Sequence, residues 1–159
     1  MKKNKELTEE KLSELSHKDQ VRFALFCANQ TRDFWYGSKI YENTYKLIEL
    51  WLEGKATAEQ CGDASSACYD ECNSYSNSNK TLTNDFVYAG RTLLYAANTV
   101  KETWYTNAQM KLVSSNAVMA LALAWRDYAD TAKAEQDQLN YYNELRYIDE
   151  NFEKIVLEG

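Results

Sequence analysis

The sequence has no proline and only five glycines among its 159 residues. Proline breaks helix interiors and an internal glycine destabilises a helix, so their scarcity favours long helices joined by short polar turns. No segment shows the sustained period-two alternation that is typical of strands. We therefore expect an all-α fold, a single-domain bundle of six to seven helices over 16–159, preceded by a frayed N-terminal helix or tail over 1–15.

The sequence also lacks a long hydrophobic run. Its most apolar stretch, Ala117–Trp125 (AVMALALAW), is half the length of the ~18 apolar residues that a membrane-spanning helix needs. The basic start, Met1–Lys5, is not followed by the apolar segment of a secretory signal. We expect a cytoplasmic bacterial protein with no membrane partner.

Groups that carry out chemistry are scarce. The lone histidine forms Glu14-x-x-His17, only half of the paired motif of di-iron carboxylate bundles, and we expect His17 to be an exposed structural residue. No Cys-x-x-Cys zinc knuckle, glycine-rich phosphate loop or nucleophile elbow occurs. The four cysteines are interpreted as core residues: Cys27, Cys61, Cys68 and Cys72. We expect a protein that is not an enzyme, with no catalytic residue, metal ligand or cofactor.

Capping signals and helical spacing locate the helices. Ser16-x-x-Asp19 and Thr57-x-x-Gln60 are typical helix starts, and Gly37 and Gly54 are typical of helix ends. The predicted segments run from Ser16 to the turn at Gly37, over 39–53, from Thr57 to a loop at 74–80, from Thr83 or Asn84 to about 104, over 107–132 and over 133–157.

Two apolar features predict how the helices pack. Gly90 lies within a wide apolar helical face, where it costs about 1 kcal/mol relative to alanine, which predicts a close helix crossing at that point. Leu123 and Trp125 give the sixth predicted helix a second apolar face, so we expect that helix to be central.

Charge is unevenly distributed around a net value of −6. Residues 40–72 carry 2 basic and 7 acidic groups, and residues 130–159 carry 3 basic and 8 acidic groups, so each block has a net charge of −5. A nucleic-acid-binding protein has the opposite charge pattern. The acidity either serves solubility alone or attracts a basic protein partner.

Aromatic residues occur as neighbours at 34–36, 104–105 and 141–142. Because adjacent helical residues cannot both face inward, we expect one of each pair to be partly exposed. Exposed tyrosine and tryptophan beside carboxylates suit a protein-binding patch. The candidate partner-binding residues are Glu42, Glu49, Glu53, Asp63, Asp70 and Glu71, with Tyr141 and Glu144 as a second patch.

Three segments carry a resemblance to a known family. They are Val21–Ala28 (VRFALFCA), Tyr45–Gly54 (YKLIELWLEG), and the Ala-rich pair at Tyr88–Asn98 (YAGRTLLYAAN) and Asn116–Trp125 (NAVMALALAW). With these segments the chain resembles the all-α immunity proteins of bacterial polymorphic toxin systems, in particular the family numbered five and its relatives. The resemblance implies a protein that binds and neutralises a cognate toxin domain. Many such toxins are nucleases with basic clefts, which acidic blocks would engage by mimicking a nucleic-acid backbone.

Two other functions stay open. Glu9 and Glu10 followed by Glu14 are the nearest match in the chain to the i, i+1 and i+4 spacing with which carboxylates hold Mg²⁺ in nucleotide hydrolases, which would make the chain a metal-dependent hydrolase. Alternatively, an apolar cavity among the last three helices would indicate a non-catalytic scaffold or ligand-binding module.

Overall fold

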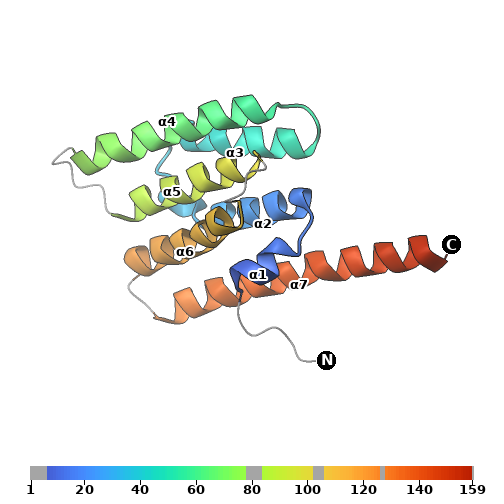
Figure 1. Ribbon diagram of the computed structural model, residues 1–159. Coiled ribbons are helices and arrows are strands. Elements are labelled where there is room, and N and C mark those ends of the chain that lie inside the picture. Colours follow the sequence, from blue (N-terminus) through green and yellow to red (C-terminus); the bar gives the residue numbers. More distant parts are fainter. Residues whose placement is uncertain (1–6, 78–83, 102–105, 126–127, 159) are drawn as a thin grey trace.

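A computed structural model describes residues 7–77, 84–101, 106–125 and 128–158 (Figure 1). These residues form an all-α bundle, as expected, without strands in the described ranges. Its elements are α1 (Glu9–Ser13), α2 (His17–Gln30), the short 3-10 turn η1 (Arg32–Phe34), α3 (Lys39–Leu52), α4 (Ala58–Asn77), α5 (Asn84–Thr99), α6 (Thr106–Trp125) and α7 (Tyr128–Glu158).

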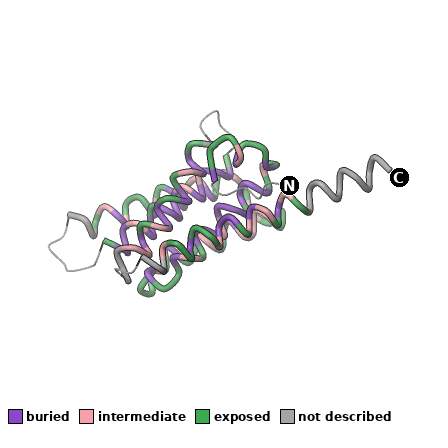
Figure 2. The backbone as a smooth tube through the Cα atoms, turned by 90° about the horizontal axis from the view of Figure 1, so that it is seen from below, coloured by how far each residue is buried: buried purple, intermediate pink, exposed green. Residues whose placement is uncertain are grey.

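The helices stack from one end of the molecule to the other. Figure 1 shows the α3–α4 pair at one end, α5 and α2 in the middle, then α6, and finally α7 with α1 at the other end. Helix α5 packs against α2, α3, α4 and α6, so it occupies the centre of the bundle. Figure 2 shows the buried residues along the inward sides of the helices.

Two of the predicted helix starts are confirmed by their capping hydrogen bonds. The backbone N–H of Asp19 donates to Ser16 Oγ over 3.3 Å at the start of α2. At α4 the box is reciprocal: Gln60 N–H donates to Thr57 Oγ1 over 3.1 Å, and Thr57 N–H donates to Gln60 Oε1 over 2.8 Å. Each bond satisfies a backbone donor that the first helical turn leaves without an intrahelical partner.

Other boundaries differ from the prediction. The predicted break between the sixth and seventh helices at 132–133 is wrong, because α6 ends at Trp125 and α7 already begins at Tyr128. The predicted loop at 74–80 is helical as far as Asn77, and its remainder lies outside the described residues, as does the alternative cap Thr83. Neither place carries a glycine or proline, so the sequence has no local signal for where these helices end.

The close crossing predicted at Gly90 is confirmed. The hydroxyl of Tyr41, a fully buried residue of α3, donates to the carbonyl of Phe86 over 3.0 Å and lies directly over Gly90. A Cβ at this position would collide with the Tyr41 hydroxyl and with the sulfur of Cys72. The glycine therefore lets α3 and α4 both approach α5 at one point.

Helix α6 is less enclosed than predicted. Its residues Leu112 and Met119 remain 42% and 44% exposed, although Met110, Val113 and Ala117 on its other side are fully buried. The side chains of Leu123 and Trp125, on which the prediction depended, lie outside those described. An apolar helix thus forms part of the molecular surface. Among the described residues, no helix is long and apolar enough to cross a membrane.

The N-terminal segment is better packed than a frayed tail. Leu7, Leu12 and Leu15 are buried, and the hydroxyl of Tyr142 in α7 donates to the carbonyl of Lys11 over 3.0 Å. Residues 7–15 therefore contribute to the core, while 1–6 lie outside the described residues.

Candidate protein-binding face

The acidic residues predicted on α3 form one stripe. Glu42, Glu49 and Glu53 are spaced by seven and four residues, which places them on one side of a helix. Thr44, whose hydroxyl contacts Cys68 Sγ over 2.9 Å, marks the side of α3 that faces α4. Glu42 lies two residues away, about 200° around the helix at 3.6 residues per turn. The stripe therefore faces away from α4.

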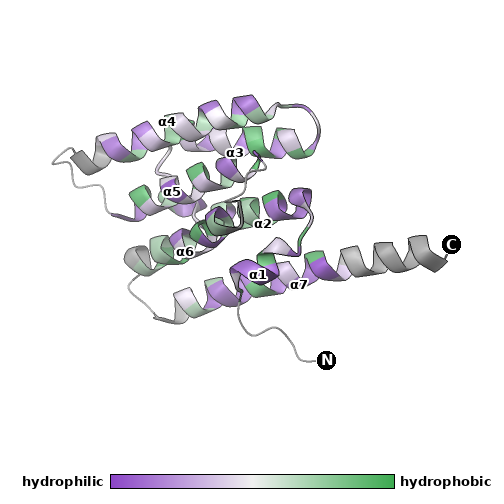
Figure 3. Ribbon diagram, in the orientation of Figure 1, coloured by the Kyte–Doolittle hydropathy of each residue, from purple (hydrophilic) through white to green (hydrophobic). Residues whose placement is uncertain are grey.

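The acidic residues of α4 lie elsewhere. Asp63 and Asp70 each follow a buried cysteine, Cys61 and Cys68, by two residues, so they lie on the opposite, outer side of α4 and are exposed. Glu71 is half-buried on a flank of α4. Burial raises the pKa of the Tyr41 hydroxyl, Cys72 and Cys68 add to that rise, and the Glu71 carboxylate makes a smaller further contribution. Figure 3 shows hydrophilic residues along this outermost helix. The structure therefore separates Asp63 and Asp70 from the stripe on α3.

A stacked arginine connects the stripe on α3 to the end of α2. The guanidinium carbon of Arg32 lies 4.6 Å from the ring centroids of both Trp35 and Tyr45. Trp35 is buried and donates its Nε1–H to Thr31 Oγ1 over 3.0 Å, and Arg32 Nε–H donates to Asn29 Oδ1 over 3.0 Å. The cation is thereby fixed over two rings while remaining exposed to solvent.

Tyr45 shows which residues surround this stack. Burial raises the pKa of its hydroxyl, Arg32 opposes that rise through a hydrogen bond and its charge, and the carboxylate of Glu49 adds to it. Glu49 therefore lies beside the arginine stack.

The second predicted patch lies next to the first across α2. Tyr141 of α7 stacks on Phe26 of α2, with ring centroids 4.5 Å apart and planes inclined by 12°. Burial raises the pKa of Tyr141, Arg22 lowers it, and Asp19, Glu144 and Tyr45 raise it further. Arg22 and Asp19 pair over 2.6 Å. The tyrosines of α3 and α7 are thus neighbours, with α2 between their helices.

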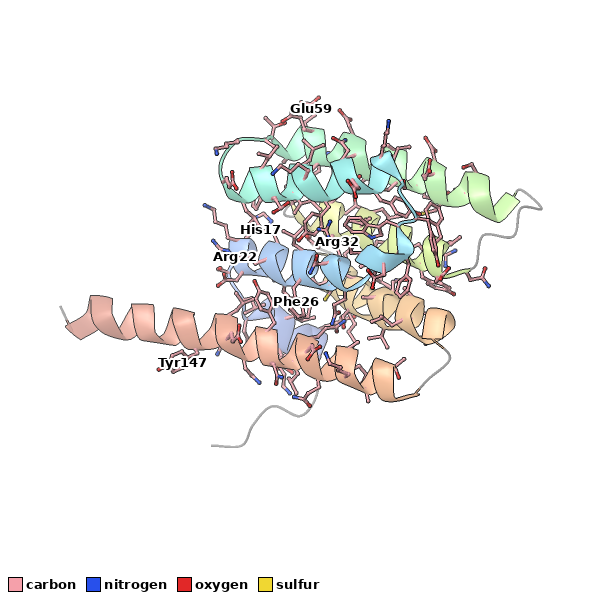
Figure 4. All side chains as sticks on the ribbon, turned by 180° about the vertical axis from the view of Figure 1, so that it is seen from behind. His17, Arg22, Phe26, Arg32, Glu59 and Tyr147 are labelled. Atoms are coloured by element: carbon pink, nitrogen blue, oxygen red, sulfur yellow. The ribbon has the colours of Figure 1, made fainter. Side chains whose placement is uncertain are left out.

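These side chains make one surface, which we call the α2–α3–α7 face. Figure 4 shows it from behind, with α3 above, α2 in the middle and α7 below, and with Arg22, Phe26 and Arg32 labelled on it. It brings together three of the predicted residues, Glu49, Tyr141 and Glu144. The residues of the face are Asp19, Arg22, Phe26, Arg32, Tyr45, Glu49, Tyr141 and Glu144.

Sequence reasoning missed the contribution of α2 and η1 to this face. Arg22, Phe26 and Asn29 recur at spacings of four and three, on a side of α2 next to the one that buries Phe23 and Cys27. The sequence did contain one signal of this contribution, because Phe26 is an aromatic residue within an otherwise polar helical stripe. Phenylalanine is rarely placed on a helix face that is fully exposed to solvent.

The aromatic neighbours only partly follow the expected alternation. Tyr142 is fully buried and Tyr141 is half-buried, as predicted. In the group at 34–36, Tyr36 is 55% exposed, as predicted for one of the neighbours. Phe34 and Trp35, however, are both buried, because they lie in the 3-10 turn and at its end rather than in a regular helix. The pair at 104–105 lies outside the described residues.

His17 is not the exposed residue that we expected. It is half-buried, its Nε2 lies 2.8 Å from the carbonyl oxygen of Thr99 at the end of α5, and its ring meets Trp51 edge-on with centroids 5.3 Å apart. His17 therefore joins the start of α2 to α3 and α5.

The cysteines lie in the core. All four are buried, and Cys72 Sγ lies 3.3 Å from the Tyr41 hydroxyl. Burial raises the pKa of Cys61 to about 11 and that of Cys68 to about 12. Since the thiolate is the reactive form, these thiols are inert at neutral pH.

The acids proposed for a hydrolase do not converge. Glu9 and Glu10 are exposed, and Glu14 pairs with Arg146 of α7 over 3.6 Å. Within the described ranges, the structure brings no three histidine, cysteine, aspartate or glutamate side chains together in a way that would hold a metal ion.

A groove of about 560 Å³ lies between α6 and α7. Val118, Met119 and Leu139 form its apolar walls, Leu7 lies among its lining residues, and Gln138 lies on its buried side. It is partly open to solvent and lies between two of the three helices among which the ligand-binding alternative expected an apolar cavity.

The chain matches no known protein family, no curated protein and no solved structure.

Proposed function

We propose that this protein is an immunity-type inhibitor of the bacterial cytoplasm that binds and neutralises a cognate toxin domain through the α2–α3–α7 face. The observation that carries the proposal is the pair of aromatic stacks on this face, Arg32 with Tyr45 and Phe26 with Tyr141. The resemblance of three sequence segments to immunity proteins supports the proposed class of function. The aromatic and charged residues of the face support the proposed mode of binding.

The composition of the face suits protein recognition. Tyrosine, tryptophan and arginine dominate the binding energy of protein interfaces, and they act best when packing fixes them before the partner arrives. Here Arg32 is fixed by two rings and by Asn29, while Tyr141 is fixed by Phe26. Such pre-ordered side chains lose little conformational entropy on binding.

The charge of the chain favours a basic partner. A net charge of −6 attracts a basic domain over a distance, and Glu49 and Glu144 place carboxylates beside the aromatic stacks. A nuclease toxin, with its basic cleft, has the matching charge.

A binding role also agrees with how the reactive groups are used. The lone histidine is engaged by Thr99 and Trp51, and the thiols are buried with raised pKa values. These side chains support the fold. We therefore propose that the protein inhibits its partner by binding it and not by catalysing a reaction.

The first experiment is capture of the partner. The full chain serves as bait in a lysate of the native bacterium, and proteins that elute only at high salt are identified by mass spectrometry. We expect a basic toxin domain, and expression of this chain should protect cells that produce that domain. The proposal would fail if the purified toxin domain does not bind this protein. It would also fail if cells that produce the toxin die although they express this protein.

Variants then test the face. Tyr141→Ala should weaken binding at least tenfold, mainly through faster dissociation, because it removes a fixed aromatic contact.

The double change Glu49→Gln and Glu144→Gln should slow association and flatten its salt dependence. The matched control, Asp63→Asn with Asp70→Asn, removes the same charge from the outer side of α4. If both double variants slow association equally, the net charge of the protein, and not the carboxylates of this face, would be responsible for the attraction.

A further inference from the structure

We propose that the partner of the α2–α3–α7 face presents a carboxylate side chain to Arg32, so that the face recognises a basic protein surface with one acidic residue at a fixed place. This inference rests on the proposed function, because it adds the chemistry of the partner at the same face. Arg32 is the exposed cation that Figure 4 labels between α2 and α3.

One side of the Arg32 guanidinium is open. Its carbon lies 4.6 Å from the ring centroids of Trp35 and of Tyr45, and these two centroids lie only 5.5 Å apart. Rings on opposite sides of the guanidinium would have centroids about twice 4.6 Å apart, so both rings lie on the same side. Because the residue is exposed, the other side of the guanidinium faces solvent, where a partner can reach it.

The guanidinium also retains hydrogen-bond donors. Of its five N–H groups, Nε–H donates to Asn29 Oδ1 over 3.0 Å, and one more is used in the hydrogen bond with Tyr45. Three N–H groups remain on the planar fork with which arginine binds a carboxylate through two parallel hydrogen bonds. Asn29 and the two rings fix this fork before a partner arrives, so little side-chain entropy is lost on binding.

No carboxylate of the protein pairs with Arg32 within the described ranges. Arg22, on the same face, pairs with Asp19 over 2.6 Å, and the two charges offset each other. Arg32 stays without an ion pair there although Asp33 follows it in the chain and Glu49 lies beside the stack. A partner that covered Arg32 without a counter-charge would bury an unpaired cation, which weakens binding. A carboxylate of the partner removes that cost.

The surrounding charges favour a protein carboxylate over the phosphates of a nucleic acid. A chain of net charge −6 repels a polyanion. Glu49 lies beside Arg32, and Glu144 lies beside Tyr141 on the same face, so one cation stands among carboxylates that attract basic groups. The matching surface is basic with one acidic side chain opposite Arg32. This order of charges selects the partner and fixes its orientation.

The sign of one charge reversal is the test, with the captured toxin domain as the probe. If that domain were uniformly basic where it meets Arg32, Arg32→Glu would replace repulsion by attraction and tighten binding. With a carboxylate opposite Arg32, we expect Arg32→Glu to weaken binding at least tenfold. Arg32→Gln tests the same sign without adding a charge and should weaken binding less. Circular dichroism and urea denaturation should show that both variants fold, because the residue is exposed.

Arg91→Glu is the matched control. Arg91 of α5 is also exposed, and its guanidinium carbon lies 5.0 Å from the ring centroid of Tyr88. The substitution changes the net charge by the same amount and also removes an arginine from an aromatic ring. Helix α5 contributes no residue to the α2–α3–α7 face, so Arg91→Glu should not weaken the binding of a basic domain.

Charge exchange then identifies the partner's carboxylate. Each surface aspartate and glutamate of the toxin domain is replaced by lysine in turn. One replacement should restore binding of the Arg32→Glu chain at least tenfold and weaken binding of the unchanged chain.

The role of Arg32 would be overturned by unchanged or tighter binding of Arg32→Glu, by an equal loss in Arg91→Glu, or by the absence of a restoring replacement. In each of these cases the toxin inhibition stands, because the unchanged chain still binds. A toxin domain that does not bind the unchanged chain would remove both proposals.

Discussion

At the scale of single residues, Gly90 is the position where the bundle tolerates no side chain. Gly90→Ala would place a Cβ 2.6 Å from Cζ of the Tyr41 ring and still closer to the Tyr41 hydroxyl and the Cys72 sulfur. The gain in helix propensity, about 1 kcal/mol, is smaller than the cost of moving a buried tyrosine. We expect a net loss of about 2–3 kcal/mol in the free energy of unfolding, measured by urea denaturation.

Gly62 provides the control for that substitution. It also lies inside a helix, but its added Cβ would meet only the end of the flexible Lys101 side chain, 3.0 Å from Nζ. Gly62→Ala should therefore leave stability unchanged or raise it by up to about 1 kcal/mol. Equal losses in the two variants would contradict the role assigned to the crossing at Gly90.

The buried thiols predict how stability depends on pH. Burial raises the pKa of Cys68 from 9.0 to about 12 and that of Cys61 from 9.0 to about 11, so above pH 9 the unfolded chain releases protons that the folded chain keeps. Stability is then complete below pH 9 and is lost as pH rises through 9 to 12, by up to about 1.4 kcal/mol per pH unit for each such group. Urea titrations between pH 8 and 11 measure this slope.

Replacing one thiol isolates its share of that slope. Cys27→Ala removes a fully buried group whose pKa burial also raises, so its stability should fall less steeply above pH 9 than that of the unchanged chain. A slope that the substitution does not alter would show that Cys27 is not one of the groups responsible.

At the scale of helices, the capping box of α4 is the clearest local determinant. Thr57→Ala removes the side-chain acceptor of the Gln60 N–H and should cost about 1 kcal/mol in the free energy of unfolding. Ser66→Ala, in the exposed middle of the same helix, should be neutral or slightly stabilising because alanine is the better helix former. A Thr57→Ala chain as stable as the Ser66→Ala chain would mean that packing alone fixes this helix start.

This local chemistry explains which parts of the fold the sequence allowed us to predict. The starts at Ser16 and Thr57 and the end at Gly54 were predictable because hydrogen bonds or backbone conformation within a few residues determine them. The division between α6 and α7 was not predictable, because the residues there all have ordinary helix propensity and none is a glycine or proline that would mark a helix end.

The candidate site shows the same division. Spacing along one helix correctly grouped Glu42, Glu49 and Glu53, because helical geometry alone decides it. It did not reveal that Tyr141 lies near Tyr45, since that neighbourhood depends on α2 lying between α3 and α7. Nor did it separate Asp63 and Asp70 from the α3 stripe, because a shared block of acidic sequence carries no information about how two helices are rotated.

At the scale of the whole molecule, a buried polar network ties three helices together. Gln138 of α7 is 1% exposed, and its Nε2–H groups donate to Gln30 Oε1 of α2 over 2.9 Å and to the carbonyl of Ser114 in α6 over 3.3 Å. Its Oε1 accepts from the Ser114 hydroxyl, and Gln30 Nε2–H donates to the carbonyl of Ala134 over 3.2 Å. Such a network fixes α7 in one register against the bundle, because a shifted helix would leave these groups buried and unpaired.

The substitution Gln138→Glu tests this network through its pH dependence. At neutral pH the buried carboxylate would have no N–H group to donate to Gln30 Oε1. We therefore expect a loss of about 2–4 kcal/mol in the free energy of unfolding. A protonated glutamic acid has nearly the shape of glutamine and can donate one hydrogen bond, so burial should raise the pKa of the new group. Its folded pKa then exceeds the unfolded one, and the variant's deficit relative to the unchanged chain should shrink as pH falls from 8 towards 5.

The exposed Gln136→Glu change on the same helix is the control, because its carboxylate stays in water and its small effect should not vary over that range. Urea denaturation of the three chains at pH 8, 6.5 and 5 provides the comparison. A Gln138→Glu deficit that stays constant with pH would show that the position requires only shape. A deficit that shrinks would show that hydrogen bonding across α2, α6 and α7 holds the long terminal helix, which carries Tyr141 and Glu144 of the proposed toxin-binding face.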